Sequence, residues 1–476
     1  MSKVLSHLTP NLFFKYFEEI SAIPRMSLHE EKIADYIENF ARERSLFCVR
    51  DSANNVFVTK AATPGREKEG AVLLQGHTDM VCEANEGTVH DFLTDGLDLY
   101  VDGDFIKARG TTLGADNGVA VAMMLAALDG EFSSHPALEC LFTSGEEIGL
   151  VGAGCFDYSL IKARKMINLD SAEEGFVTVG CAGGVRSAVT LEGVLEENSD
   201  PCLRITVKGL IGGHSGEDIN RNRHSATSLI FRILRSLSLR HDVRLVSVNG
   251  GDKDNAIARE ACAVVACKDA YAVKKELALI EGDVRGELAE SDKNMLLLVS
   301  DEVCGKAFDK DSTKKILLCG SVRTGVLKMS AQIDGLVEFS RNLGSVSTDG
   351  EEINFVWSTR SPKEGQLDSG EEEITLAAEL CNATEIKHYN RYPGWNYPGQ
   401  SELCDSFCAA FEKLYGKEIK RLILHAGLEC GLVKNAIPDM DIISVGPDEI
   451  DIHSPDERLG IPSTQRLCAV IAEMMK

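Results

Sequence analysis

The stretch that most constrains this chain is residues 71–80, which read Ala-Val-Leu-Leu-Gln-Gly-His-Thr-Asp-Met. Its apolar first half is typical of a buried strand in a parallel sheet, where both faces of the strand are covered. Ligands of such sheets bind at the carboxyl ends of the strands, and His77 and Asp79 stand at that end. Because they are two residues apart, their side chains point the same way in extended backbone. The stretch therefore predicts either an exposed His-x-Asp pair or a metal ligand with a supporting partner.

Later parts of the chain repeat this arrangement of an apolar strand followed by polar, metal-competent side chains. The residues in such positions are Asp116, Glu146, Glu147, Asp170 and His453. Asp116 differs in lying in a glycine-flanked loop, directly before a helix expected over residues 119–129. Adjacent parallel strands bring their carboxyl ends to one edge of a sheet. We therefore expect these side chains to converge, although they are far apart in the sequence.

Two histidines and three carboxylates match a site for two divalent ions, most often zinc. Three carboxylates around one ion would leave a net negative charge, whereas two ions with a shared carboxylate and a hydroxide come close to neutrality. Glu146 neighbours a ligand but is not needed as one, so its free carboxylate is suited to act as a general base. The alternative is that acidic loops simply decorate an acidic protein. That reading explains one or two of the segments but poorly explains all of them at strand ends.

Length and composition limit the classes of protein that fit. A chain of 476 residues is too long for one compact core, so two or three domains are expected. The 50 Lys and Arg against 74 Asp and Glu give a net charge of −24, which argues against a nucleic-acid partner. The start shows no secretory signal, and the longest apolar run, residues 119–128, is too short to span a membrane. Fifteen cysteines without C-x-x-C pairs predict reduced thiols in a cytoplasmic protein.

The order of expected elements divides the chain into three parts. Residues 1–185 alternate strands and helices, which predicts an α/β domain with a mixed, mostly parallel sheet covered by helices. Residues 186–392 also form strands and helices, but their strand ends carry no acidic cluster, so we expect an inserted αβ lid domain. Residues 393–476 would complete the first domain. Two local helix starts are also expected, with Thr9-Pro10 as N-cap and first turn, and with a capping box over Ser27–Glu30.

The strand-end motifs resemble those of the co-catalytic di-zinc peptidases. The matching segments are Leu-Gln-Gly-His77-Thr-Asp79-Met, Leu-Gly-Ala-Asp116-Asn-Gly, Thr-Ser-Gly-Glu146-Glu147-Ile-Gly, Asn-Leu-Asp170 and Ile-His453-Ser-Pro. Three further segments look like those of the aminoacyl-histidine dipeptidases, the Xaa-His dipeptidases that hydrolyse carnosine. They are His425-Ala-Gly-Leu-Glu429-Cys-Gly, Gly212-Gly-His214-Ser-Gly and Trp357-Ser-Thr-Arg360-Ser. The resemblance covers nearly the whole chain.

The resemblance implies a ligand set for two Zn²⁺ ions per chain, which Co²⁺ or Mn²⁺ could replace. His77, Asp116 and Asp170 would hold one ion. Asp116, Glu147 and His453 would hold the other, so that Asp116 bridges the two. The family also carries a cis peptide bond directly after the bridging aspartate. An aspartate at position 170 is found in the dipeptidase and aminopeptidase members, whereas carboxypeptidase members usually have glutamate there.

The resemblance also implies catalytic and substrate-binding roles for a dipeptide substrate such as β-alanyl-histidine. Asp79 would orient His77, and Glu146 would take a proton from the bridging water, as a hydroxide forms, and pass it to the leaving amine. In the lid domain, His214 would donate a hydrogen bond to the oxyanion, and Arg360 would bind the substrate carboxylate. The remaining candidates for substrate contacts are Asn255, Gly427 and Glu429.

Other interpretations remain open on the sequence alone. The chain could be a related di-zinc deacylase, carboxypeptidase or broad-specificity dipeptidase, because lid geometry sets the substrate. A nucleotide-binding oxidoreductase is suggested only by Val151-Gly-Ala-Gly154, a weak match because Asp157 stands where the third glycine is expected. A non-catalytic relative would be expected to lose Glu146 or a ligand, and none is lost. A homodimer is compatible with the sequence but not required by it.

Overall fold

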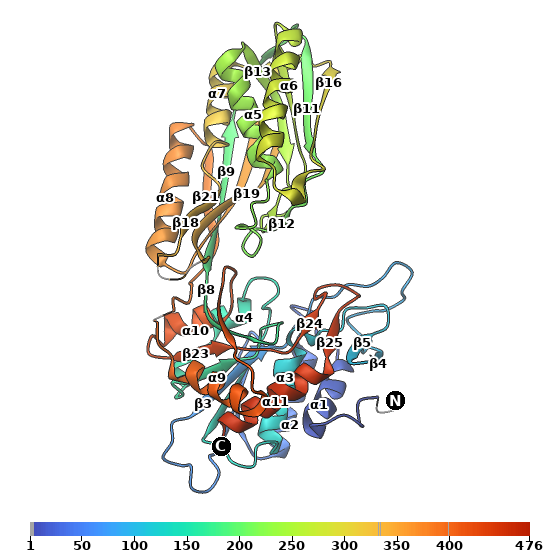
Figure 1. The fold of residues 1–476 in the computed structure, drawn as a ribbon, viewed down its shortest axis with the longest axis vertical. Coiled ribbons are helices and arrows are strands. Elements are labelled where there is room, and N and C mark those ends of the chain that lie inside the picture. The colour runs from blue at the N-terminus through green and yellow to red at the C-terminus, as the bar shows by residue number, and fades with distance from the viewer. Residues whose placement is uncertain (1–3, 332, 334, 398) are drawn as a thin grey trace. The chain divides into compact units, whose positions relative to one another are not determined.

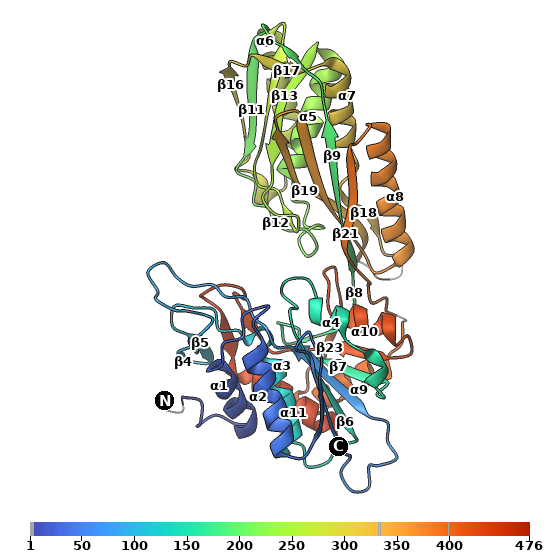
Figure 2. The same ribbon diagram turned by 180° about the vertical axis from the view of Figure 1, so that it is seen from behind.

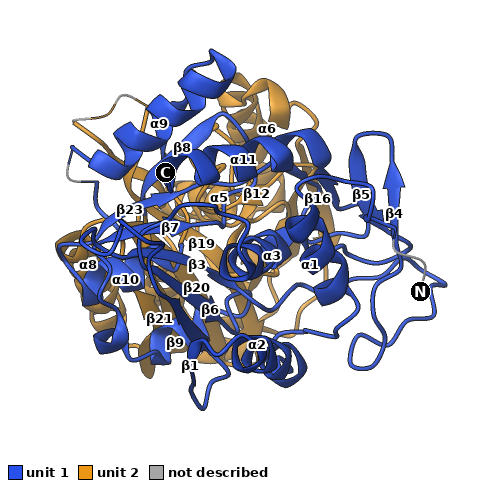
Figure 3. Ribbon diagram, turned by 90° about the horizontal axis from the view of Figure 1, so that it is seen from below, with its two compact units in different colours: residues 1–181, 395–423, 428–476 blue, residues 182–394, 424–427 orange. Residues whose placement is uncertain are grey.

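The computed structural model describes residues 4–331, 333, 335–397 and 399–476. They form two compact units, which Figure 3 colours separately. Unit 1 comprises residues 1–181, 395–423 and 428–476, and unit 2 comprises residues 182–394 and 424–427. All fifteen cysteines are free thiols. Within the described residues, no helix combines the length and the apolar character that crossing a membrane would require.

Unit 1 is built on an eight-stranded sheet with the order β1-β2-β6-β3-β7-β23-β8-β22. The strands are β1 (Phe47–Arg50), β2 (Val56–Lys60), β3 (Val72–His77), β6 (Leu138–Thr143), β7 (Lys165–Asn168), β8 (Phe176–Cys181), β22 (Lys420–Leu424) and β23 (Asp441–Ser444). The four central strands β6, β3, β7 and β23 run parallel. Strand β1 pairs antiparallel with β2, β2 with β6, and β8 with β23. The predicted mixed α/β class is confirmed, with the parallel pairing concentrated at the centre.

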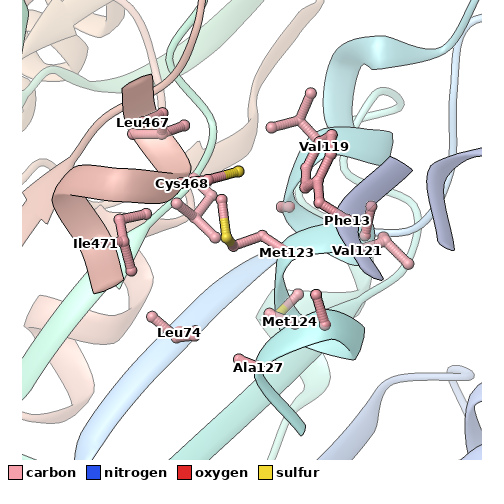
Figure 4. Close-up of a cluster of buried hydrophobic side chains, with 14 of the residues drawn as sticks. Phe13, Leu74, Val119, Val121, Met123, Met124, Ala127, Leu467, Cys468 and Ile471 are labelled. Carbon is pink, nitrogen blue, oxygen red and sulfur yellow. The ribbon is translucent and has the colours of Figure 1, made fainter. Parts of the chain in front are cut away.

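Helices from both ends of the chain cover this sheet (Figures 1 and 2). They are α1 (Asn11–Ser21), α2 (Glu31–Glu43), α3 (Ala115–Asp129), α4 (Val151–Cys155), α9 (Glu402–Tyr415), α10 (Cys430–Ala436) and α11 (Ile461–Met474), with a 3₁₀ turn at Tyr158–Leu160. Helix α3 is apolar all round and buried from residue 117 to 128, as expected of a helix that other elements enclose. Its side chains pack with Phe13 of α1, Leu74 of β3 and Ile471 of α11 (Figure 4). This core holds the start of α3 against the end of β3.

Both predicted helix starts differ from the structure. Helix α1 begins at Asn11, with Pro10 as N-cap and no side-chain cap, one residue later than expected. Helix α2 begins at Glu31, and no side chain caps it. The hydroxyl of Ser27 instead donates to Asp79 Oδ2 at 2.7 Å. The capping-box prediction was wrong because a distant buried carboxylate takes the hydroxyl that the local pattern assigned to the helix.

A small second sheet in unit 1 joins two segments that are distant in sequence. Its order is β24-β25-β5-β4, with β4 (Leu99–Asp102), β5 (Phe105–Ala108), β24 (Glu449–Ile450) and β25 (Arg458–Gly460). All its pairings are antiparallel. His453 lies in the connection between β24 and β25, so this sheet fixes where its loop leaves the core.

Unit 2 is a nine-stranded antiparallel sheet with helices packed against it (Figure 1). The order is β16-β11-β15-β13-β19-β20-β9-β21, and β18 also pairs with β19. The strands are β9 (Gly183–Glu192), β11 (Cys202–Lys208), β13 (Val243–Gly250), β15 (Ala261–Cys267), β16 (Leu296–Glu302), β18 (Gly325–Met329), β19 (Val337–Asp349), β20 (Glu352–Ser361) and β21 (Glu385–Tyr392). The helices are α5 (Ala226–Arg240), α6 (Ala270–Glu287), α7 (Lys310–Cys319) and α8 (Glu364–Leu380), with a 3₁₀ turn at Glu290–Asp292.

Two short pairings complete unit 2. Strands β10 (Leu195–Glu197) and β17 (Lys306–Phe308) pair antiparallel, as do β12 (Gly213–His214) and β14 (Ala256–Ile257). The second pair fixes the backbone of His214 beside the segment that contains Asn255.

Candidate metal centre

The central parallel strands of unit 1 end in the residues that the sequence singled out. His77 is the last residue of β3 and lies opposite Thr143, the last residue of β6. Glu146 and Glu147 follow β6 within four residues, and Asp170 follows β7 within two. The convergence follows from the parallel pairing, since these strands end at the same edge.

Five side chains form two groups that share Asp116. In the first group, His77 Nε2 lies 3.0 Å from Asp116 Oδ1 and 3.5 Å from Asp170 Oδ1. In the second, His453 Nε2 lies 3.2 Å from Asp116 Oδ2 and 3.1 Å from Glu147 Oε1. Asp116 therefore turns one carboxylate oxygen to each group. The possible ligand atoms of each group all lie within 4.8 Å of one another.

The donor set and its spacing fit divalent metal ions. Imidazole nitrogens and carboxylate oxygens are ligands that zinc accepts at about 2.0–2.2 Å, so neighbouring ligands of a tetrahedral ion lie about 3.3 Å apart. The nitrogen–oxygen distances of 3.0–3.5 Å in both groups match that edge. The residues present therefore fit a pair of ions with a shared carboxylate.

Electrostatics also favour bound cations. Burial raises the pKa of Glu146 well above its usual range, and nearby carboxylates add to the rise. Burial likewise raises the pKa of Glu147 and of Asp170. Burial acts in the same direction on Asp116, but hydrogen bonds with His453 and His77 outweigh it and hold its pKa below the usual range. Ionising Glu146, Glu147 and Asp170 is therefore unfavourable without added positive charge, which two divalent ions would supply.

Asp79 supports the centre from behind. Its side chain is fully buried, and Oδ1 lies 3.3 Å from His77 Nδ1, while the Asp79 carbonyl oxygen lies 3.1 Å from the same nitrogen. With Nδ1 occupied in this way, Nε2 of His77 faces Asp116 and Asp170. The Asp79 carboxylate also accepts hydrogen bonds from the backbone N–H groups of Glu146 at 3.0 Å and Glu147 at 3.2 Å. One carboxylate therefore holds two of the candidate loops in place.

Asn117 supports the candidate centre in a similar way, through contacts that the sequence did not reveal. Its Nδ2 donates to Asp170 Oδ1 at 2.8 Å, and its Oδ1 accepts from the Ala120 N–H at 3.1 Å. The peptide bond between Asp116 and Asn117 is cis, as the resemblance implied. Both residues have non-helical backbone angles inside α3. Nothing in the local sequence signals the contact with Asp170, because the two residues are far apart in the chain.

The structure places Glu429 in unit 1, where it is fully buried. Its Oε2 accepts from Thr143 Oγ1 at 2.7 Å and from Gln75 Nε2. Burial raises the pKa of Glu429 to about 7. Its other oxygen, Oε1, has no hydrogen-bond partner among the described residues. The expected contact of Glu429 with an amino group of the substrate stays a prediction.

The other predicted substrate-contact residues lie in unit 2. Arg360 is buried, and its Nη1 donates to the hydroxyl of Tyr392 at 2.8 Å. Among the residues that the structure describes, no carboxylate forms an ion pair with Arg360, and its Nε lacks a hydrogen-bond partner. A buried guanidinium in this state is suited to bind a carboxylate from outside the chain. Tyr392, which the sequence did not suggest, also packs against Gly427, where an added Cβ would lie 2.7 Å from its ring.

His214 lies beside Arg360 as a neutral donor. Burial and the neighbouring Arg360 lower the pKa of His214 to about 4. Its Nδ1 accepts a hydrogen bond from the Glu217 N–H at 3.2 Å, so the proton of the neutral ring is on Nε2. That nitrogen lies 3.4 Å from Arg360 Nη2. The imidazole of His214 and the guanidinium of Arg360 are therefore direct neighbours in unit 2. Asn255 is exposed, and its backbone carbonyl accepts a hydrogen bond from the Ser215 N–H at 2.8 Å.

Comparison with known proteins places this geometry in a family. Residues 73–476 match the model of peptidase family M20/M25/M40. The chain belongs to that family. It is accordingly a hydrolase that acts on peptide bonds. The chain is 38% identical, over 485 aligned residues, to the cytosol non-specific dipeptidase of Escherichia coli, with 99% of this chain and 98% of that protein covered.

Solved structures of other peptidases also superpose on this chain. The aminoacylhistidine dipeptidase of Vibrio alginolyticus superposes with a TM-score of 0.89 at 35% identity, covering 99% of this chain and 98% of that one. The aminopeptidase PepT of Bacillus cereus superposes with a TM-score of 0.57 at 14% identity, covering 98% of this chain and all of that one. The second likeness extends to the fold alone.

Proposed function

We propose that this M20-family peptidase is a cytoplasmic dipeptidase that uses two divalent metal ions, preferentially zinc, to hydrolyse Xaa-His dipeptides such as β-alanyl-histidine. The observation that carries the proposal is the pair of ligand groups that share Asp116. The two relatives that match nearly the whole chain, a cytosol non-specific dipeptidase and an aminoacylhistidine dipeptidase, support the substrate class.

The ligand assignment follows the two groups. His77 and Asp170 would hold one ion, Glu147 and His453 would hold the other, and Asp116 would contact both. When bound, such ions lower the pKa of water and polarise a carbonyl group. Co²⁺ and Mn²⁺ accept the same nitrogen and oxygen donors and could replace zinc.

Glu146 is the proposed general base of the reaction. Its carboxylate lies in a third group with His77 and Glu147, whose ligand atoms are within 4.8 Å of one another. It is not needed for either shared group, so one carboxylate oxygen is available to accept a proton from the attacking water. The raised pKa suits a group that accepts this proton and then releases it to the leaving amine. Asp79 would hold the Glu146 backbone and the His77 ring in position.

The residues of unit 2 would recognise the dipeptide. Arg360 would bind the C-terminal carboxylate, for which a planar guanidinium fork is suited. His214 would donate its Nε2–H to the oxyanion that develops on the scissile carbonyl. Tyr392 would hold the Arg360 side chain through the 2.8 Å hydrogen bond. Asn255 and Gly427 remain proposed contacts.

The test is hydrolysis of β-alanyl-histidine by the purified, zinc-loaded chain, with Ala-Ala and an N-acetyl amino acid in parallel. We expect cleavage of the histidine dipeptide, loss of activity with a chelator and recovery with added zinc. Cleavage of the acetylated compound alone would move the chain to the deacylases. Failure to cleave any of the three with two ions bound would refute the dipeptidase assignment.

A second candidate is a dipeptidase of broad specificity. The 38% identity to a dipeptidase named non-specific favours it. The same assay separates the two, because a broad-specificity enzyme would cleave Ala-Ala with a kcat/KM similar to that for β-alanyl-histidine.

A further inference from the structure

The loop that carries Asp116 is held by a buried carboxylate from the other end of the chain. Glu457 is 2% exposed, and its two oxygens accept backbone hydrogen bonds from consecutive residues of this loop. The donors are the N–H groups of Leu113 at 2.7 Å, Gly114 at 2.9 Å, Ala115 at 2.7 Å and Asp116 at 3.5 Å. Glu457 follows the proposed ligand His453 by four residues, so one short segment supplies both.

A buried cation holds the opposite side of the same loop. Arg25 is 2% exposed, and its guanidinium donates to the carbonyl oxygens of Thr78 at 3.1 Å, Asp79 at 3.2 Å and Gly114. Thr78 and Asp79 directly follow His77. Glu457 therefore holds the N–H group of Gly114, and Arg25 holds its carbonyl oxygen. Burial lowers the pKa of Arg25, and Glu457 is the charged group that most opposes this effect.

The packing around Arg25 leaves little freedom. A Cβ on Gly114 would lie 2.5 Å from Arg25 Nη2, and one on Gly118 would lie 2.9 Å from it. Gly114 also has a φ of +64°, which favours glycine. The guanidinium is thus enclosed by the segment on each side of Asp116.

We propose that Arg25 and Glu457 are positioning residues that set the bridging orientation of Asp116 and thereby the affinity of the centre for metal. The inference rests on the proposed function, since it assumes that Asp116 contacts two ions. These two charges join the three segments that carry His77, Asp116 and His453. Neither side chain would touch the ions or the substrate. A displaced loop would turn one Asp116 oxygen away from its group, so binding at both positions should weaken.

A matched control separates this role from general stabilisation. Glu139 is also a buried carboxylate of unit 1, 4% exposed, and it accepts backbone hydrogen bonds at 3.1 Å from Lys162 and Ala163. It lies near the start of β6, at the opposite end of the parallel strands from the ligands. Glu139→Gln and Glu457→Gln therefore remove similar interactions from the two ends of one sheet.

The experiment measures Zn²⁺ affinity of the full chain by competition with a chromophoric chelator, together with the stability of the metal-free protein. We expect Glu457→Gln to bind zinc about 10–100-fold more weakly than the unaltered chain, as is usual when a partner behind the ligands is lost. Glu139→Gln should lose stability but keep the original affinity. At saturating zinc, Glu457→Gln should regain much of its kcat.

Arg25→Lys provides a second variant in case Glu457→Gln does not fold. It keeps the buried positive charge but cannot donate to three carbonyl groups at once, so it too should weaken zinc binding. Unchanged affinity in either variant, or equal weakening in Glu139→Gln, would overturn the inference and leave the proposed function standing. An unaltered chain that binds no zinc would overturn both.

Discussion

Replacing Gly76 by alanine should force β3 and α3 apart and destabilise unit 1. An ideal Cβ on Gly76 would lie 2.2 Å from Ala120 Cβ and 3.0 Å from Asn117 Nδ2, whereas ordinary contacts are 3.4–4 Å. The strand and the helix would therefore have to separate by about 1 Å at a position where both are fully buried. Overpacking of this kind reduces the free energy of unfolding by about 1–3 kcal/mol.

A double-mutant cycle tests this clash by also removing the obstructing methyl group of Ala120. Ala120→Gly alone should cost about 1 kcal/mol in helix propensity and about 0.8 kcal/mol for the lost buried methyl. In the double variant the new alanine methyl occupies the vacated space, so we expect the two losses not to add. A coupling of about 1–3 kcal/mol is the expected size for residues in direct contact.

The two tryptophans allow each unit to be followed separately. Trp395 lies in unit 1 and Trp357 in unit 2, and both are buried. In a Trp357→Phe background, urea unfolding monitored by Trp395 fluorescence reports the stability of unit 1. The close packing of β3 on α3 would be refuted if the free energy of unfolding of Gly76→Ala equals that of the unaltered background within about 0.5 kcal/mol. It would also be refuted if the losses of the two single variants simply add in the double variant.

The remaining predictions concern one side chain in unit 1 and two in unit 2. Glu146→Gln should lower kcat about 10²–10⁴-fold while elemental analysis finds an unchanged metal content; full activity would contradict the base assignment. Arg360→Gln should raise KM about 10–100-fold for a free dipeptide, with a much smaller change for its C-terminal amide, and equal changes would exclude carboxylate binding. Burial and Arg360 lower the pKa of His425 to about 3, so its unfolded form binds a proton between pH 6.5 and 3 that the folded form does not. The free energy of unfolding of unit 2 should fall by up to roughly 5 kcal/mol as the pH falls through this window. Unfolding followed by Trp357 fluorescence should show a smaller dependence on pH in His425→Asn, and an unchanged dependence would contradict the prediction.

The sequence singled out the candidate ligand segments because each signal was local. An apolar strand followed at once by His77, Glu147 or Asp170 can be read within a few residues. Parallel pairing then brings these strand ends together without any further information. Asp116 was the exception, since only its glycine-flanked loop marked it, and the sharing of its two oxygens came from the resemblance.

Contacts between distant segments could not be predicted in this way. Ser27 fitted a capping box as well as it fits its actual partner, Asp79, which lies 52 residues away. Arg25 and Glu457 occupy positions without any periodic pattern, and their partners are mostly backbone groups. Such interactions depend on how separate loops meet, and a single sequence does not record that.

The strand order of unit 2 was beyond the sequence for a related reason. The alternation of buried and exposed residues predicts strands, but β9 pairs with both β20 and β21, more than 150 residues later. When several antiparallel strands have similar compositions, their hydrophobic patterns do not show which of them pair. The sequence predicts an inserted segment over residues 186–392, but it could not predict these pairings.

The position of β23 makes completion of the candidate metal centre a late event in synthesis. Residues 441–444 insert between β7 and β8, which are made more than 250 residues earlier. Until that segment emerges, β7 and β8 each lack a neighbour, and unpaired strand edges favour aggregation. His453 follows nine residues after the end of β23. A chain truncated before residue 441 would retain His77, Asp116 and Asp170 but have an open sheet and an incomplete second group. If the proposed ligand set is correct, both metal positions can be filled only after residues 441–453 have been made, so a nascent or C-terminally degraded chain would lack the second position.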